Sequence, residues 1–234
     1  MFDIKLLNMN EISPEIQYVE EKRLVQTLIT GKPAEGAFWA ASLTLLIVLM
    51  GSALYWILPA GFSALMPAVR SNIFHGHQYW RIFSAIFIHG DLEHLLSNAL
   101  LLWIFSFFVF GYTGFKIFPI ASLAVAAVVN FIAVSTYPLN TELLGASGLV
   151  YVLGGFWLAL YFQVQRQYAL ANRLIRVLGI AMMIFLPSTF VPTTSYRTHA
   201  IGFLAGIAMA IIYFYLNKQS IRSSEVYKVS RIEI

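Results

Sequence analysis

The 234-residue sequence contains no cysteine, and only 11% of its residues are charged. The absence of cysteine excludes disulfide bonds, thiolate catalysis and cysteine-ligated zinc or iron–sulfur sites. The scarcity of charge argues against a water-soluble globule, in which about a quarter of the residues are charged. Because 59% of the residues are hydrophobic and the mean hydropathy is +0.74, the composition indicates an integral membrane protein.

Several functional patterns are also missing. No basic face with interleaved aromatic residues is present, so we expect no nucleic-acid partner. The sequence contains no H-E-x-x-H motif, which argues against a zinc intramembrane protease. It also has no carboxylate within the central parts of the apolar segments, which argues against an aspartyl intramembrane protease. Leu149 stands where the last glycine of a G-x-S-x-G nucleophile elbow would be, which argues against an α/β-hydrolase. His75 and His77 lack further ligands nearby in the sequence, and we expect no metal and no cofactor.

Long apolar segments dominate the chain, and a bilayer core requires roughly 20 apolar residues per helix. Six segments are candidates for such helices, the fifth being shorter and containing Pro187: Ala37–Pro59, Leu92–Gly111, Ile117–Pro138, Leu143–Phe162, Leu174–Val191 and His199–Leu216. The connection Ala60–Asp91 is too long for a simple turn. The predicted fold class is therefore an all-α integral membrane protein, a six-helix bundle with a long, partly helical first loop.

The two ends of the chain are polar. We expect residues 1–36 to form a cytoplasmic segment with a helix from Glu15 to Leu28, residues 37–217 the membrane domain, and residues 218–234 a mobile cytoplasmic tail. With six spans, 12 of the 15 Lys and Arg residues fall on the side of the two termini. The positive-inside rule then predicts that both termini are cytoplasmic. Ser147 and all five histidines lie toward the outer side.

Polar and small residues share one face in each of two apolar segments. In the fourth segment they are Ser147, Tyr151 and Gly154, and in the sixth they are His199, Gly202 and Gly206. Small residues allow membrane helices to approach closely, so contact between these faces would bring Ser147 opposite His199. A serine beside a histidine is the minimum for an activated hydroxyl nucleophile. No acidic residue lies inside either segment, so a dyad is expected rather than a triad.

A second polar pair lies near the start of the second segment. His94 and Asn98 are four residues apart and therefore point the same way. They could bridge helices through hydrogen bonds, or complete an oxyanion hole with the backbone N–H of Ser147. Gly145 and Gly148 flank the serine and permit close backbone approach.

Four short motifs follow one another along the chain: YWR at Tyr79–Arg81, HGDLEHLLSN at His89–Asn98, GASG at Gly145–Gly148 with Tyr151, and HAIGFLAG at His199–Gly206. In this order they resemble the motifs of the rhomboid intramembrane serine proteases, and the resemblance covers about Gly36 to Leu216. The resemblance implies that Ser147 is the nucleophile and that His199 acts as general base and then acid. It further implies an oxyanion hole of His94, Asn98 and the Ser147 N–H.

The resemblance also assigns supporting roles. Tyr151 would stack on the ring of His199, and Trp80 and Arg81 would shape the first loop. Plainer interpretations are that Trp80 belongs to the aromatic belt at the membrane interface and that Arg81 binds carbonyl oxygens or lipid phosphates. The fifth span and the loop before His199 would gate access of the substrate. The six-span layout resembles the basic bacterial form, which implies the bacterial inner membrane.

The predicted function is hydrolysis of peptide bonds in single-span or other transmembrane proteins, near the outer membrane face and in contact with lipid. Two alternatives stay open: a catalytically silent rhomboid-like binding protein and a small transporter. A transporter would tend to contain inverted repeats and helices broken at the bilayer midplane, and the sequence shows no internal repeat.

Overall fold

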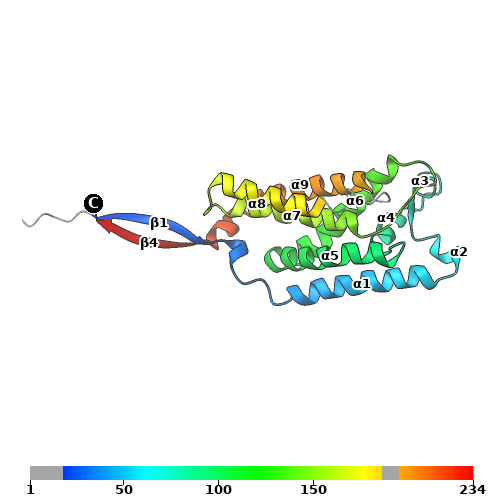
Figure 1. The fold of residues 1–234 in the computed structure, drawn as a ribbon, viewed down its shortest axis with the longest axis horizontal. Helices are drawn as coiled ribbons and strands as arrows, with labels where there is room; N and C mark the ends of the chain where they lie inside the picture. The colour runs from blue at the N-terminus through cyan, green and yellow to red at the C-terminus, as the bar shows by residue number, and fades with distance from the viewer. Residues whose placement is uncertain (1–17, 186–194, 234) are drawn as a thin grey trace, which may run out of the picture.

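A computed structural model of the chain describes residues 18–185 and 195–233. Long helices form a bundle, and a two-stranded ribbon projects from one end of it (Figure 1). The long helices are α1 (Ala37–Ile57), α5 (Leu92–Thr113), α6 (Ser122–Ser135), α7 (Ser147–Val164), α8 (Leu170–Phe185) and α9 (Tyr196–Ser223), and the π-helical η3 (Lys116–Ala121) leads into α6.

Five helical stretches within the described residues are long and apolar enough to cross a membrane. They are Ala37–Ile57, Leu92–Thr113, Lys116–Ser135, Ser147–Val164 and Tyr196–Ser223. The predicted fifth span corresponds to α8, whose 16 described residues are too few to span by this measure. The end of that predicted span, with Pro187, falls outside the described residues. The helical membrane architecture is thus confirmed, whereas the count of six spans is not.

The loop between α1 and α5 is partly helical, as predicted. It contains α2 (Ala60–Ser63), α3 (Arg70–Phe74), α4 (Arg81–Ser84) and the 3-10 helix η2 (Ala85–Phe87). A short strand in this loop, β2 (Ala68–Val69), pairs antiparallel with β3 (Glu142–Leu143), which precedes α7. The first loop is therefore tied directly to the segment that leads to Ser147.

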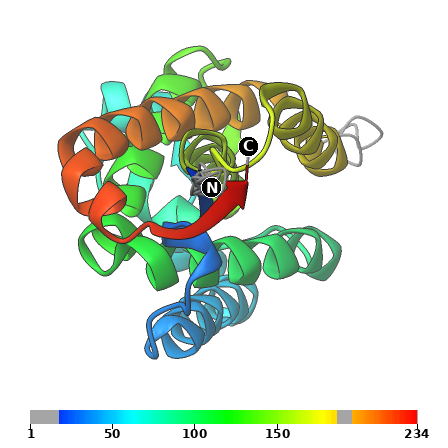
Figure 2. The same cartoon turned by 90° about the vertical axis from the view of Figure 1, so that its left-hand side faces the viewer.

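Helix α7 lies at the centre of the bundle, enclosed by the other helices (Figure 2). Its neighbour α9 approaches very closely through the predicted glycine face of α9, Gly202 and Gly206. On α7 the glycines in this contact are Gly148 and Gly155, whereas the predicted Gly154 faces Phe105 on α5 and Ile184 on α8. A Cβ added at Gly202 would lie 2.9 Å from the carbonyl oxygen of Gly148, and one at Gly206 would overlap the carbonyl oxygen of Val152. These glycines allow backbone to contact backbone.

The two chain ends form structure that differs from the predictions. Strand β1 (Tyr18–Gln26) begins at the first described residue and pairs antiparallel with β4 (Val226–Glu233), with Leu24 opposite Tyr227. The predicted helix Glu15–Leu28 is wrong over this strand, which is followed by the 3-10 helix η1 (Leu28–Thr30). The tail after Lys218, predicted to be mobile, contains regular structure, since α9 continues to Ser223 and β4 follows.

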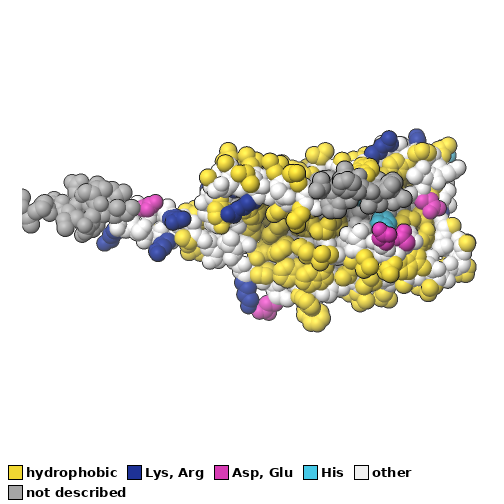
Figure 3. All heavy atoms as spheres, in the orientation of Figure 1, with side chains coloured by type: hydrophobic (Ala, Val, Ile, Leu, Met, Phe, Trp, Pro, Cys, Tyr) yellow, Lys and Arg dark blue, Asp and Glu magenta, His cyan; other side chains and the backbone are white. Residues whose placement is uncertain are grey.

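The surface of the bundle is largely hydrophobic, with charged side chains gathered toward its ends (Figure 3). On α1, for example, Trp39 is 73% exposed and Met50 is 57% exposed. Water would penalise so much contiguous apolar surface, whereas lipid would not. The exposed faces fit an integral membrane protein.

Candidate active site

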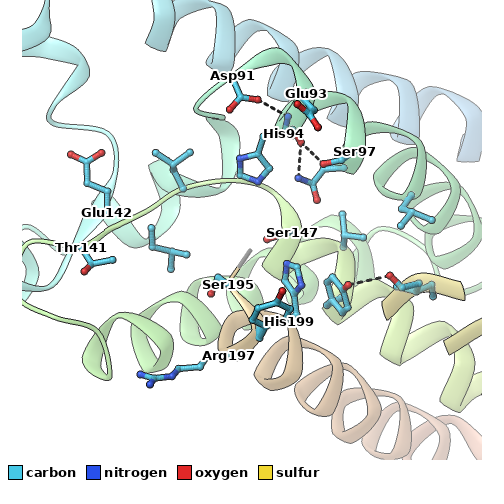
Figure 4. A pocket seen from close by; sticks show the side chains of 18 of the residues that line it. Asp91, Glu93, His94, Ser97, Thr141, Glu142, Ser147, Ser195, Arg197 and His199 are labelled. Atoms are coloured by element: carbon cyan, nitrogen blue, oxygen red, sulfur yellow. Dashed lines mark hydrogen bonds between the residues drawn. The ribbon is translucent and has the colours of Figure 1, made fainter. Parts of the chain in front are cut away.

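A cavity of about 920 Å³ opens between the N-terminal ends of α5, α7 and α9. Side chains from all three helices line it, including Ser147, His199, His94 and Asn98 (Figure 4). Asp91, Glu93 and Arg197 also border this cavity. The structure thus brings the four polar residues singled out in the sequence to one hollow.

Ser147 is the first residue of α7 and is 7% exposed. The turn before it depends on Gly145, whose φ of +118° is rarely adopted by residues with a side chain. Gly145 donates its N–H to the carbonyl oxygen of Ala85 at 2.8 Å. A Cβ at Gly145 would also lie 2.8 Å from Cε1 of His94. Glycine at this position therefore lets the His94 ring lie directly against the serine turn.

His199 lies in the first turn of α9 and is 7% exposed. Its ring stacks on the ring of Tyr151, with centroids 4.0 Å apart and planes inclined by 14°. The Tyr151 hydroxyl donates to the carbonyl oxygen of Ile184 at 3.2 Å. This stacking orients the imidazole at the edge of the cavity.

The hydrogen-bond partners of His199 are few. Its Nδ1 is buried and bonds to none of the residues that the structure describes. Likewise, no hydrogen bond within residues 18–185 and 195–233 joins Ser147 Oγ to His199, although both line the cavity. Catalytic hydrogen bonds are often long or poorly aligned without substrate.

His94 and Asn98 reach the cavity from the first turns of α5. Helix α5 begins at Asp91, whose carboxylate accepts the His94 backbone N–H at 2.7 Å, a standard N-cap. Asn98 donates one amide hydrogen from Nδ2 to the carbonyl oxygen of His94 at 2.9 Å. Since an amide carries two such hydrogens, Asn98 retains a second donor.

Trp80 and Arg81 lie away from the cavity, in the first loop. Arg81 is only 2% exposed, and its Nη1 donates to the carbonyl oxygens of Ala64 at 2.7 Å and Pro67 at 3.0 Å. Its Nε donates to Oε1 of Gln78 at 2.6 Å. Trp80 is 53% exposed. These contacts give Arg81 a structural place in the loop.

Some polar residues near the site were not singled out from the sequence. The Tyr137 hydroxyl hydrogen-bonds to Ser195 Oγ, and the same hydroxyl oxygen lies 3.2 Å from Thr198 Oγ1. The buried His89 contacts Ser52 and the backbone of Ala146. Thr198 adjoins His199 and His89 opens the second motif, but no spacing rule links either of them to its partners.

Acidic and histidine side chains do not cluster as metal ligands in the part of the chain that the structure describes. Within the described residues, no group of three or more His, Asp or Glu side chains could hold a metal ion. His75 and His77 are exposed in the first loop.

Residues 76–216 match the Rhomboid domain, more than half of the chain and all of the residues that line the cavity. The chain belongs to the rhomboid family. The family resemblance predicted from the four motifs is thereby confirmed. No curated protein sequence matches this rhomboid.

Proposed function

We propose that this rhomboid is an intramembrane serine endopeptidase that cleaves transmembrane proteins through a dyad of Ser147 and His199. The observation that carries the proposal is the cavity that gathers a hydroxyl, an imidazole and two further polar side chains inside an apolar bundle. Polar groups within a membrane domain are costly, so their convergence favours a functional site over helix packing.

The chemistry would begin with attack of Ser147 Oγ on the scissile carbonyl carbon. His199 would accept the serine proton as the C–O bond forms, and would then donate it to the leaving amine. Because Nδ1 of His199 is buried without a partner among the described residues, Nε2 is the nitrogen assigned to this transfer. A water molecule would hydrolyse the resulting ester by the reverse use of the same groups.

Negative charge on the tetrahedral intermediate would be stabilised by His94, by Asn98 Nδ2 and by the N–H of Ser147. Ser147 is the first residue of α7, where unpaired N–H groups and the helix dipole favour an anion. Removing one donor from an oxyanion hole costs about 2.7–4 kcal/mol in a soluble protease. We therefore assign these donors a large share of the rate enhancement.

The location of the site supports cleavage near one membrane face. His199 lies at the start of α9, whereas β4 begins three residues after its end, so the cavity and the ribbon lie at opposite ends of this 28-residue helix. The charge bias favours cytoplasmic termini, which supports our proposal that the cavity opens at the outer face of a bacterial inner membrane. Single-span or other transmembrane proteins would be the substrates, reaching the cavity through lipid.

A fluorophosphonate probe tests the proposal, because it labels an activated serine. The parent rhomboid should be labelled and should cleave a transmembrane substrate in proteoliposomes, and Ser147→Ala should lose both activities. Ser106→Ala is the matched control, since Ser106 is a buried serine on α5 outside the cavity lining. If the folded parent protein neither reacts with the probe nor cleaves the substrate, yet binds transmembrane proteins, it is instead a catalytically silent binding protein.

A further inference from the structure

His89 is a fully buried polar side chain that the proposed mechanism does not use. It lies between η2 and α5 and does not line the cavity. Its Nδ1 is 3.0 Å from Oγ of Ser52 on α1, and its Nε2 accepts the backbone N–H of Ala146 at 3.2 Å. The His89 carbonyl oxygen accepts the indole N–H of Trp56 at 2.7 Å. Every polar group named here has a partner.

These partners determine the tautomer of His89. A backbone N–H can only donate, so Nε2 must be the unprotonated nitrogen. The proton of the neutral ring then resides on Nδ1 and is donated to Ser52 Oγ. Burial, assisted by the nearby His94, lowers the pKa of His89 to about 3. The ring therefore remains neutral at physiological pH and keeps Nε2 available as an acceptor.

The bond from Ala146 connects His89 to the candidate active site. Ala146 is the residue immediately before Ser147 and forms the N-cap position of α7. The His89 ring also meets the His94 ring edge to face, with centroids 4.9 Å apart. His89 thus contacts both the turn that carries the Ser147 N–H and one of the side chains proposed to stabilise the oxyanion.

We propose that His89 is a positioning residue that holds the Ala146–Ser147 backbone and the His94 ring in the geometry of the oxyanion hole, with Ser52 fixing its tautomer. This assignment rests on the proposed protease function. Misplacement of reacting groups by about 1 Å can slow an enzyme by roughly 100-fold, even when the altered residue touches no substrate. The effect should fall on kcat, because His89 lies outside the cavity that receives the substrate.

Two amide substitutions separate the roles of the ring nitrogens. The terminal amide of glutamine reaches the place of Nε2, so His89→Gln can still accept the Ala146 N–H. The shorter asparagine reaches only the place of Nδ1, so His89→Asn can bond to Ser52 but leaves the Ala146 N–H unpaired. We expect His89→Asn to lower kcat by roughly 10- to 100-fold with KM changed less than about twofold, and His89→Gln to restore most of the loss. Ser106→Ala, another buried-serine substitution, is the control for Ser52→Ala, which we expect to lower kcat by several fold.

If His89 only fills space, the asparagine and glutamine variants should have similar thermal midpoints in detergent and also similar kcat values. Equal kcat values for the two variants, or a loss confined to KM, would therefore overturn the proposal. The ¹⁵N NMR shifts of the His89 imidazole give a readout that does not require activity, and they should show protonated Nδ1 and unprotonated Nε2. A parent with this tautomer but without cleavage would refute the protease function, whereas an active parent with protonated Nε2 would refute the positioning role alone.

Discussion

A methyl group added at Gly206 should separate α7 from α9 and thereby impair both stability and activity. A Cβ at this position would overlap the carbonyl oxygen of Val152 and would lie 2.8 Å from the backbone nitrogen of Phe156. Both are backbone atoms of α7, so no side-chain rotation can relieve the overlap. Gly206→Ala therefore forces one helix to move relative to the other.

The matched substitution is Gly179→Ala on α8, where a Cβ would meet nothing within 4 Å. Both changes gain up to about 1 kcal/mol of helix propensity, so this gain cancels in the comparison. Overpacking costs about 1–3 kcal/mol, and overlap with backbone favours the upper end. With about 2–4 °C per kcal/mol for a chain of this size, Gly206→Ala should melt roughly 6–12 °C below Gly179→Ala.

Thermal unfolding in one fixed detergent, paired with cleavage of a transmembrane substrate, measures both effects. His199 lies two turns before Gly206 on the same helix, so displacement of α9 should also reduce kcat by at least tenfold. Gly202→Ala should behave similarly, because its Cβ would lie 2.9 Å from the Gly148 carbonyl oxygen. Equal melting temperatures for Gly206→Ala and Gly179→Ala would refute the close packing from which these magnitudes follow.

Three further predictions concern the site. Tyr151→Leu should lower kcat about two- to tenfold by removing a ring contact with His199 worth about 0.5–1.5 kcal/mol, whereas Tyr151→Phe should keep most of the rate; steady-state kinetics showing equal rates would contradict the stacking role. Asp91→Ala should destabilise α5 by about 1 kcal/mol through loss of the N-cap to His94, and Asp91→Asn should not; identical melting curves for both would contradict the cap. Cleavage should be unchanged by EDTA, since Ser147 and His199 need no metal for this chemistry, and inhibition reversed by added metal would count against the dyad.

The membrane helices could be predicted because their cause is local. A bilayer requires about 20 consecutive apolar residues, and this requirement is visible in composition alone. Residues three, four or seven apart share a helix face, so the contact of the Gly202 and Gly206 face of α9 with α7 could be predicted, whereas Gly154 was wrongly placed in that contact. The stacking of Tyr151 on His199 was expected from the family resemblance, not from periodicity. Helix α8 was less predictable, because its apolar run is shorter and carries Arg173 and Arg176 near its start.

The ribbon could not be predicted from either strand, because each is only half of the structure. The β1 sequence contains the charged run Glu20–Arg23, which is compatible with a solvated helix. Its strand conformation depends on pairing with β4, about 200 residues later in the sequence. Local patterns do not encode such a partner. The same reason concealed His89, whose contacts lie on α1 and at the start of α7.

The first loop emerges as a support for the serine turn rather than a simple connection. Arg81 binds the carbonyl oxygens of Ala64 and Pro67 and so closes the loop on itself. From this closed loop, the Ala85 carbonyl accepts the Gly145 N–H, and His89 accepts the next N–H along the chain. Two consecutive backbone donors before Ser147 are thus held by one loop. Such support suits the role proposed for Ser147, because the first N–H groups of a helix have no partners within it and their direction depends on the turn before the helix. In this rhomboid the first loop binds the N–H groups of Gly145 and Ala146, and the proposed mechanism uses the next one, the N–H of Ser147, to stabilise the developing oxyanion.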